Sequence, residues 1–299
     1  WVLIRIYYRC NTHTHMNIDI KKDQHIRILS LGAGVQSSTL ALMIEKGLVP
    51  MIDAAIFADT GAEPKKVYEW LNWLEKQVSF PVLRVVNKHG SLTDNLIKVN
   101  KAEYVRGTTI PMYTRDKITG KKGILRRQCT ATYKIEPVTK RIRELLGVGY
   151  KIKVPKNKKV TQLFGISKDE VQRMRTSTYH YITFDYPLID NKMSRADCLK
   201  WMEDNGYPTP PRSACTYCPY HSNEEWRNVR KDKEEWDAVV KLDKQLRTGL
   251  YKCLPEKHNY YLHRSGLPLD EVDLDKEKNS KQLDMEFGMD NACEGMCGL

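Results

Sequence analysis

The sequence lacks any apolar run that approaches the ~20 residues a helix needs to cross a membrane. Its first eight residues are mostly apolar, but that segment is too short for such a helix, and no small-residue cleavage site follows it. Internal repeats and low-complexity tracts are also missing. These absences argue against a membrane protein and against a secretory signal peptide, and we expect a cytoplasmic protein.

Acidic residues are scarce relative to basic ones. The chain carries 49 Lys and Arg against 37 Asp and Glu, a formal net charge of +12. Such a charge favours a polyanionic partner, and we expect nucleic acid; the alternative is a basic surface with no particular partner. Basic stretches at 126–127, 140–143 and 151–159, with tyrosines among them, are typical of grooves that hold single-stranded or flipped nucleotides. These tyrosines are Tyr104, Tyr113, Tyr133 and Tyr150.

Disulfide bonds are also not expected. The chain has eight cysteines among 299 residues but no recognisable secretory signal, a combination that favours free thiols or metal ligands. Cys198 falls on the apolar side of a predicted helix, and we expect it in the core.

Short apolar runs alternate with helical patterns over the first part of the chain. The runs at 26–31, 51–59, 81–86 and 160–166 are predicted strands, and the amphipathic patterns between them are predicted helices. This alternation predicts an α/β fold with a doubly wound, mostly parallel sheet. Residues 87–127 show no such pattern and are expected to be irregular.

Two helix starts are predicted farther along the chain. Ser194 is followed three residues later by Asp197, and Ser222 by Glu225, which is the spacing of a capping box. The helix that begins after Ser222 is expected to continue to about Leu246.

A small-residue loop follows the first predicted strand. Residues 32–39 read GAGVQSST and lead into an apolar helical pattern. Such a loop leaves backbone N–H groups free at a helix N-terminus, where they bind phosphate. No Gly-Lys-Ser/Thr follows the glycines, which excludes a Walker A loop, and the third glycine of the dinucleotide fingerprint is missing. The alternative is a tight turn before a helix.

Polar turns also end other predicted strands. Asp59 and Thr60 follow the second strand, residues 165–170 (GISKDE) follow the last, and Arg173 and Arg175 come soon after. Ligands of open α/β sheets collect at the carboxyl ends of the strands. We therefore expect a nucleotide site, with Asp59 and Thr60 near ribose or metal and the two arginines near phosphate. The alternative for Asp59 is a cap on the next helix.

These motifs together resemble those of the PP-loop (N-type) ATP pyrophosphatase superfamily. Residues 30–38 (SLGAGVQSS) are similar to its phosphate loop, and residues 57–71 (FADTGAEPKKVYEWL) to the strand end and helix that follow. The chain is most similar to the phosphoadenosine-phosphosulfate (PAPS) reductase branch, through an Asp-Thr-Gly strand end and the segments 129–137 and 165–173. The resemblance covers about residues 26–219.

The phosphate loop departs from the superfamily pattern Ser-Gly-Gly-x-Asp-Ser. Residues 32–37 (GAGVQS) correspond to it and keep Gly34 and Ser37, but Gln36 stands where the pattern has Asp. The change removes a carboxylate near magnesium, and Asp59 is the candidate to substitute for it.

The resemblance implies an adenine nucleotide alpha-hydrolase-like fold. By that likeness the chain binds ATP with Mg²⁺, cleaves between the α- and β-phosphates and adenylates a substrate. Catalytic roles are implied for Asp59, Lys134, Arg173 and Cys297. The residues implied to contact the nucleotide are Ser30, Gly32, Gly34, Gln36, Ser37, Ser38, Thr39, Asp59, Thr60, Gly165 and Arg175.

The cysteines extend the resemblance. A lone Cys129 with a distant Cys215–Cys218 pair is similar to the ligand set of PP-loop enzymes that hold a [4Fe–4S] cluster, including DNA phosphorothioation and tRNA-thiolating members. The likeness implies Cys293 as a further ligand and sulfur transfer to nucleic acid, with a sulfur donor such as a cysteine desulfurase. The alternatives are a structural zinc site of Cys215, Cys218, Cys293 and Cys297, or free thiols.

Two other functions stay open. Residues 293–299 (CEGMCGL) resemble the cysteine tail of assimilatory reductases without its closing His, so a PAPS or adenylyl-sulfate reductase that uses a C-terminal cysteine is one alternative. A non-catalytic nucleotide- or nucleic-acid-binding protein is the other, which Gln36 favours.

The chain is expected to divide into three parts. Residues 1–25 are an N-terminal extension, and residues 26–192 a PP-loop nucleotide-binding α/β domain. Residues 193–299 are a C-terminal helical segment with the cysteine cluster and tail.

Overall fold

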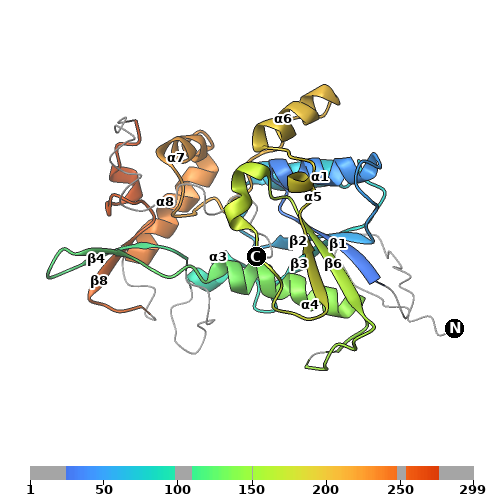
Figure 1. The fold of residues 1–299 in the computed structure, drawn as a ribbon. Coiled ribbons are helices and arrows are strands. Elements are labelled where there is room, and N and C mark those ends of the chain that lie inside the picture. The colour runs from blue at the N-terminus through green and yellow to red at the C-terminus, as the bar shows by residue number, and fades with distance from the viewer. Residues whose placement is uncertain (1–24, 98–109, 150, 248–253, 276–299) are drawn as a thin grey trace.

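The computed structural model describes residues 25–97, 110–149, 151–247 and 254–275 (Figure 1). A five-stranded sheet lies at its centre, in the order β3-β2-β1-β6-β7, and each neighbouring pair is parallel. Its strands are β1 (His25–Leu31), β2 (Ala54–Asp59), β3 (Val82–Val86), β6 (Lys159–Phe164) and β7 (Ile182–Asp185). The prediction of an α/β fold with a mostly parallel sheet is confirmed.

Helices cover both faces of this sheet. Alternate side chains of β1 point to opposite faces, so Leu29 and Leu31 pack on one side and Ile26 and Ile28 on the other. Figure 1 shows α1, α5 and α6 on the first side and α4 on the second. The first side is formed by α1 (Val35–Glu45), α2 (Lys65–Leu74), α5 (Pro187–Asp190) and α6 (Arg195–Asp204), and the second by α4 (Glu136–Leu145).

A second, antiparallel sheet lies beside the first, in the order β5-β4-β8. It shares a separate apolar core with three helices, in which Trp226 and Tyr133 are fully buried. The elements around this second core are α3 (Leu92–Leu96), β4 (Tyr113–Asp116), β5 (Lys122–Ile124), α7 (Asn223–Arg230), α8 (Lys233–Arg247), β8 (His258–Tyr261) and a 3₁₀ turn at Leu269–Glu271.

Several local expectations are corrected by these elements. Residues 87–127 are not irregular in the described part, because α3, β4 and β5 form there; β4 and β5 are short and polar, and β4 pairs with β8 far along the chain. The strand β7 was not predicted. Both capping boxes are confirmed. The helix after Ser222 ends early, since Asp232 accepts hydrogen bonds from the backbone N–H groups that begin α8.

The division of the chain at residue 192 stays a prediction. The second sheet draws β4 and β5 from before that point and β8 from after it, and α6 packs against α1. Among the described residues, no helix has the length and apolar character needed to span a membrane.

Candidate functional site

The order of the parallel strands makes the direction of the chain reverse between β1 and β6. The chain runs from β1 outward to β2 and β3, then returns to the other side of β1 as β6 and continues to β7. This is a topological switch point, where open α/β sheets bind ligands at the carboxyl ends of their strands. Gly165, just after β6, meets α1 there: an added Cβ would lie 2.6 Å from the Ser37 backbone nitrogen. Only glycine allows β6 and the start of α1 to approach so closely.

The loop after β1 positions the start of α1. Ala33 holds a left-handed backbone with φ of 57°, a strained conformation for a residue with a Cβ. Ser37 Oγ accepts a hydrogen bond from the Gly32 nitrogen at 3.2 Å and donates to the Gly34 carbonyl at 3.4 Å. Gly34 is the N-cap and supplies no side-chain acceptor to the first turn. Such an uncapped N-terminus is suited to an anionic ligand.

Three predicted nucleotide contacts from this part of the chain face the protein interior. Ser30 Oγ accepts from Gln162 at 2.7 Å, and Ser38 Oγ accepts from Trp70 Nε1 at 2.9 Å. Thr39 Oγ1 donates to a backbone carbonyl of its own helix. All three hydroxyls therefore stabilise the fold, and their role as nucleotide ligands stays a prediction.

Gln36 joins α1 to the segment after β6. Its Nε2 donates to Glu170 Oε2 at 3.2 Å and to Ser167 Oγ at 3.4 Å. Glu170 also forms a close ion pair with Arg173. The predicted Gln36 and Arg173 are thus brought to the same place, through a glutamate that sequence reasoning did not single out. Glu170 belongs to the polar turn after β6, and that turn was the available signal.

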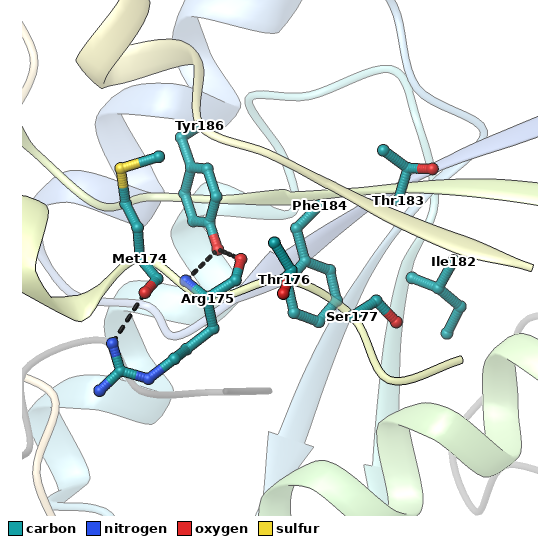
Figure 2. Close-up of a pocket in the computed structure, with 8 residues that line it drawn as sticks. All are labelled: Met174, Arg175, Thr176, Ser177, Ile182, Thr183, Phe184 and Tyr186. Carbon is teal, nitrogen blue, oxygen red and sulfur yellow. Dashed lines mark hydrogen bonds between the residues drawn. The ribbon is translucent and has the colours of Figure 1, made fainter. Parts of the chain in front are cut away.

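Arg175 lies at a separate pocket beside the edge strand β7 (Figure 2). Its guanidinium donates to the backbone carbonyls of Gln172 and Met174, so it is folded onto its own segment. The Tyr186 hydroxyl accepts from the Arg175 nitrogen and donates to the Arg175 carbonyl, which fixes that segment against β7. Contact between Arg175 and phosphate stays a prediction.

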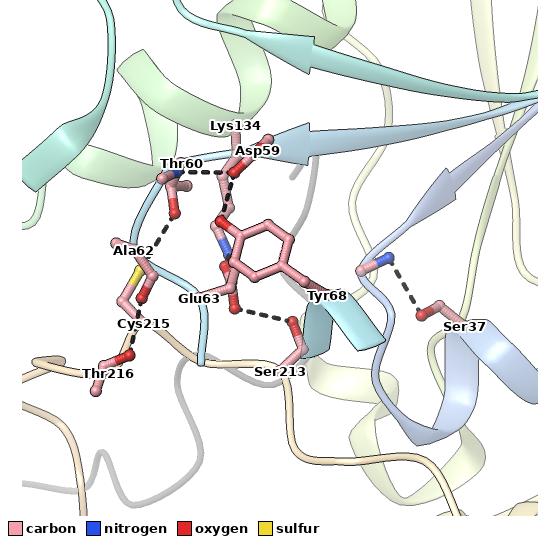
Figure 3. A network of polar contacts seen from close by, with 12 residues as sticks. Ser37, Asp59, Thr60, Ala62, Glu63, Tyr68, Lys134, Ser213, Cys215 and Thr216 are labelled. Atoms are coloured by element: carbon pink, nitrogen blue, oxygen red, sulfur yellow. Dashed lines mark hydrogen bonds and ion pairs between the residues drawn. The ribbon is translucent and has the colours of Figure 1, made fainter. Parts of the chain in front are cut away.

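The turn after β2 connects the carboxyl edge of the five-stranded sheet with the cysteine segment (Figure 3). Asp59 Oδ1 accepts from the Gly61 nitrogen at 2.8 Å and from the Tyr68 hydroxyl at 2.7 Å. Burial and this carboxylate raise the pKa of Tyr68. Thr60 Oγ1 lies 3.7 Å from Cys215 Sγ. Asp59 and Thr60 are therefore held at the carboxyl edge of the sheet, where Thr60 contacts the Cys215 thiol.

A buried ion pair lies in the same network. Lys134 Nζ is 3.4 Å from Glu63 Oε1, and only 8% and 1% of the two side chains are exposed. Ser213 Oγ donates to the other Glu63 oxygen at 3.4 Å. Lys134 belongs to a π-helical turn, Ala131–Ile135, a feature frequent at functional sites. Sequence reasoning missed Glu63 and Ser213, because neither lies at a recognisable spacing from Lys134.

Three of the predicted cysteine ligands meet. Cys129, Cys215 and Cys218 line one cavity of about 20 Å³ together with Thr60 and Lys134. That volume holds about one water molecule. Within the described ranges, no group of three or more His, Cys, Asp or Glu side chains is arranged to hold a metal ion. The three thiols therefore converge, and a metal ion or an iron–sulfur cluster at this place stays a prediction, because Cys293, the fourth predicted ligand, lies outside the described residues.

The remaining cysteine predictions differ in outcome. Cys293 and Cys297 lie outside the described residues. Cys198 is fully buried in the first core, as expected, and burial raises the pKa of its thiol to about 12.

His221 is a further buried group beside the cysteines that the sequence reasoning passed over. It continues the spacing of Cys215 and Cys218 by three residues, which was the available signal. Burial, then the charge of Arg212, lowers the pKa of His221 to about 3, so the imidazole is neutral near pH 7. Its ring packs 4.7 Å from the ring of Trp226. His221 thus ties the cysteine segment to the second core.

Comparisons with known proteins add a distant likeness. No protein-family model matches the sequence, and the curated proteins contain no match. Among solved structures, the chain is similar to phosphoadenylyl-sulfate (PAPS) reductase from Candida auris, crystallised as a phosphate complex. The two share 15% identity with a TM-score of 0.39, over 62% of this chain and 75% of that one.

Proposed function

We propose that this chain is an adenylating enzyme that binds ATP at the carboxyl edge of the five-stranded sheet and supports sulfur transfer. The observation that carries the proposal is the meeting of two features. The turns after β1, β2 and β6 surround a topological switch point, and a cavity lined by three thiols lies beside it, linked through Thr60 and Cys215.

The residues at the edge have distinct roles in this proposal. The first-turn amides of α1 bind phosphate, and Asp59 and Thr60 meet the ribose or the metal. Lys134 and Arg173 stabilise negative charge as an acceptor oxygen attacks the α-phosphorus and pyrophosphate leaves. A sulfur nucleophile at the oxidation level of hydrosulfide then attacks the activated atom of the acceptor; a bond to sulfur forms as the bond to the adenylated oxygen breaks, and AMP leaves with that oxygen. Mg²⁺, when bound, neutralises part of the phosphate charge.

The sulfur in this proposal is handled at the thiol cavity. Lys134 lines that cavity together with the three thiols. A [4Fe–4S] cluster held by Cys129, Cys215, Cys218 and Cys293 stays a prediction, as does the zinc alternative. No step here depends on either of them. A sulfur donor such as a cysteine desulfurase is the expected partner.

Nucleic acid is the proposed acceptor because the chain is strongly basic. Arg127 lines the thiol cavity, with its guanidinium 5.8 Å from the centre of the Tyr220 ring, so a positive charge stands beside the thiols. The prediction that Tyr133 stacks on bases is wrong, because that ring is fully buried in the second core. Tyr104 and Tyr150 lie outside the described residues.

One experiment tests this function. The protein is purified without oxygen, its iron, sulfide and zinc are measured, and ATP is added with single-stranded DNA or RNA. The proposal expects AMP and pyrophosphate; ADP and phosphate, or no turnover, would contradict it. Reduction of PAPS or adenylyl sulfate that needs Cys293 and Cys297 but no ATP would instead identify a reductase. Metal content decides separately between a cluster, zinc and free thiols.

A further inference from the structure

The phosphate loop carries no carboxylate of its own. Gln36 occupies the first turn of α1 with an amide. Asp59, at the end of β2, is the carboxylate that the sequence pattern favours as a replacement. However, Asp59 Oδ1 already accepts two hydrogen bonds, from the Gly61 nitrogen and from the Tyr68 hydroxyl. These contacts hold Asp59 toward α2 rather than toward α1.

Glu170 is the carboxylate that lies against the loop. Its Oε2 accepts the hydrogen bond from Gln36, and its other oxygen is paired with Arg173. Only 11% of the Glu170 side chain is exposed. The amide of Gln36 can donate to a carboxylate, whereas an aspartate at that position would repel it. Gln36 and Glu170 are therefore complementary. Where the superfamily pattern has a carboxylate on the helix after the loop, this chain has one on the turn after β6.

Arg173 is the second charged residue beside the loop after β1. Its side chain is 10% exposed, and one of its nitrogens binds Glu170. Its Nε and second terminal nitrogen are buried with no acceptor among the described residues. Buried charged donors are normally satisfied, so the two open N–H groups indicate an acceptor that a ligand supplies. A guanidinium with open donors matches the oxygens of a phosphate.

We propose that Glu170 ligates the divalent cation that accompanies the nucleotide, while Arg173 binds its phosphates. This inference rests on the proposed ATP binding. In the free protein the two side chains neutralise each other. In the complex the cation replaces Arg173 as the partner of Glu170, and phosphate oxygens replace Glu170 as the partner of Arg173. Neither charge is then buried alone.

The test measures ATP affinity by calorimetry, in Mg²⁺ and in EDTA, and Mn²⁺ binding to the ATP complex by electron paramagnetic resonance. Glu170→Gln is expected to lose the Mg²⁺ enhancement of ATP affinity and to weaken Mn²⁺ by about 10–100-fold. Asp169→Asn is the matched control, since Asp169 is exposed and, within the described part of the chain, its carboxylate accepts hydrogen bonds from the Arg195 nitrogen, away from Gln36 and Arg173. It is expected to match wild type.

Three outcomes would overturn the inference. If Glu170→Gln keeps the Mg²⁺ enhancement and Asp59→Asn loses it, Asp59 is the ligand and the proposed function stands. If ATP binds with no Mg²⁺ effect in wild type, the cation site is absent although the nucleotide site exists. If wild type binds no ATP, both proposals fail. Circular dichroism checks folding, and Glu170→Asp, which keeps the charge, should retain a reduced Mg²⁺ effect even if the glutamine variant is unstable.

Discussion

The carboxyl edge of the five-stranded sheet and the thiol cavity are neighbours, but they are built differently. The edge consists of continuous strand–turn–helix units, in which β1 leads directly into the loop and α1. The thiol cavity gathers single residues from separate segments, such as Thr60, Cys129 and Cys215. A motif that is local in sequence can tolerate change elsewhere, whereas a site assembled from distant segments depends on the packing between them. The predictions below test this difference.

The largest effect is expected from breaking the buried ion pair of the thiol side. Lys134→Met leaves the Glu63 carboxylate buried without its cation, which should cost about 3–5 kcal/mol of unfolding free energy. Denaturant unfolding measures this. The pair of the exposed Lys140 with the half-buried Glu144 is the control, and Lys140→Met should cost less than about 1 kcal/mol because Glu144 keeps Arg141 as a partner. Equal losses of unfolding free energy in the two variants would contradict the claim that burial makes the Lys134–Glu63 pair costly to break.

The next effect is a pH dependence that comes from His221. Its pKa is about 3 in the folded chain and near the ordinary value when unfolded, so only the unfolded chain takes up the proton between these values. Stability should therefore fall by about 1.4 kcal/mol for each pH unit below about 6.5. His221→Gln should remove this dependence of stability on pH. Urea unfolding midpoints measured from pH 7 to pH 5 for the variant and wild type check this.

A smaller loss of stability is expected at the carboxyl edge of the five-stranded sheet. Gly165→Ala places a Cβ within 2.6 Å of the Ser37 nitrogen, which must push β6 and α1 apart. Such overpacking costs about 1–3 kcal/mol. Gly149→Ala is the control, because its Cβ would meet only the flexible tip of Ile152. Thermal unfolding of the two variants should differ, and identical curves would mean that the close approach is not needed.

The smallest effect should be the same in both regions, because it is local. Ser194 caps α6 on the first side, and Ser222 caps α7 in the second core. Replacing either serine with alanine should cost about 1 kcal/mol. Hydrogen bonds from Ser194 also lower the pKa of Asp197 to about 2, so the α6 box should weaken only as the pH falls below about 4. Unequal losses from the two caps would show that the regions differ in local structure too.

Local signals account for what could be predicted from the sequence. Apolar runs and glycine positions predicted β1, β2, β3 and β6, and serine spacing predicted the two helix starts. Long-range pairing was not predictable, since β4 carries no apolar alternation and finds its partner β8 only in the folded chain. For the same reason the cysteine spacing indicated a common site but could not reveal Glu63, Glu170 or His221 around it.

The central claim is that a nucleotide binds where β6 meets the start of α1. Calorimetric titration of ATP with Mg²⁺ into wild type, Gly165→Ala and Gly149→Ala tests it most directly. The account predicts that wild type and Gly149→Ala bind ATP alike, and that Gly165→Ala binds it at least about tenfold more weakly, a loss of about 1.4 kcal/mol. ATP binding that is unchanged in Gly165→Ala would contradict the claim.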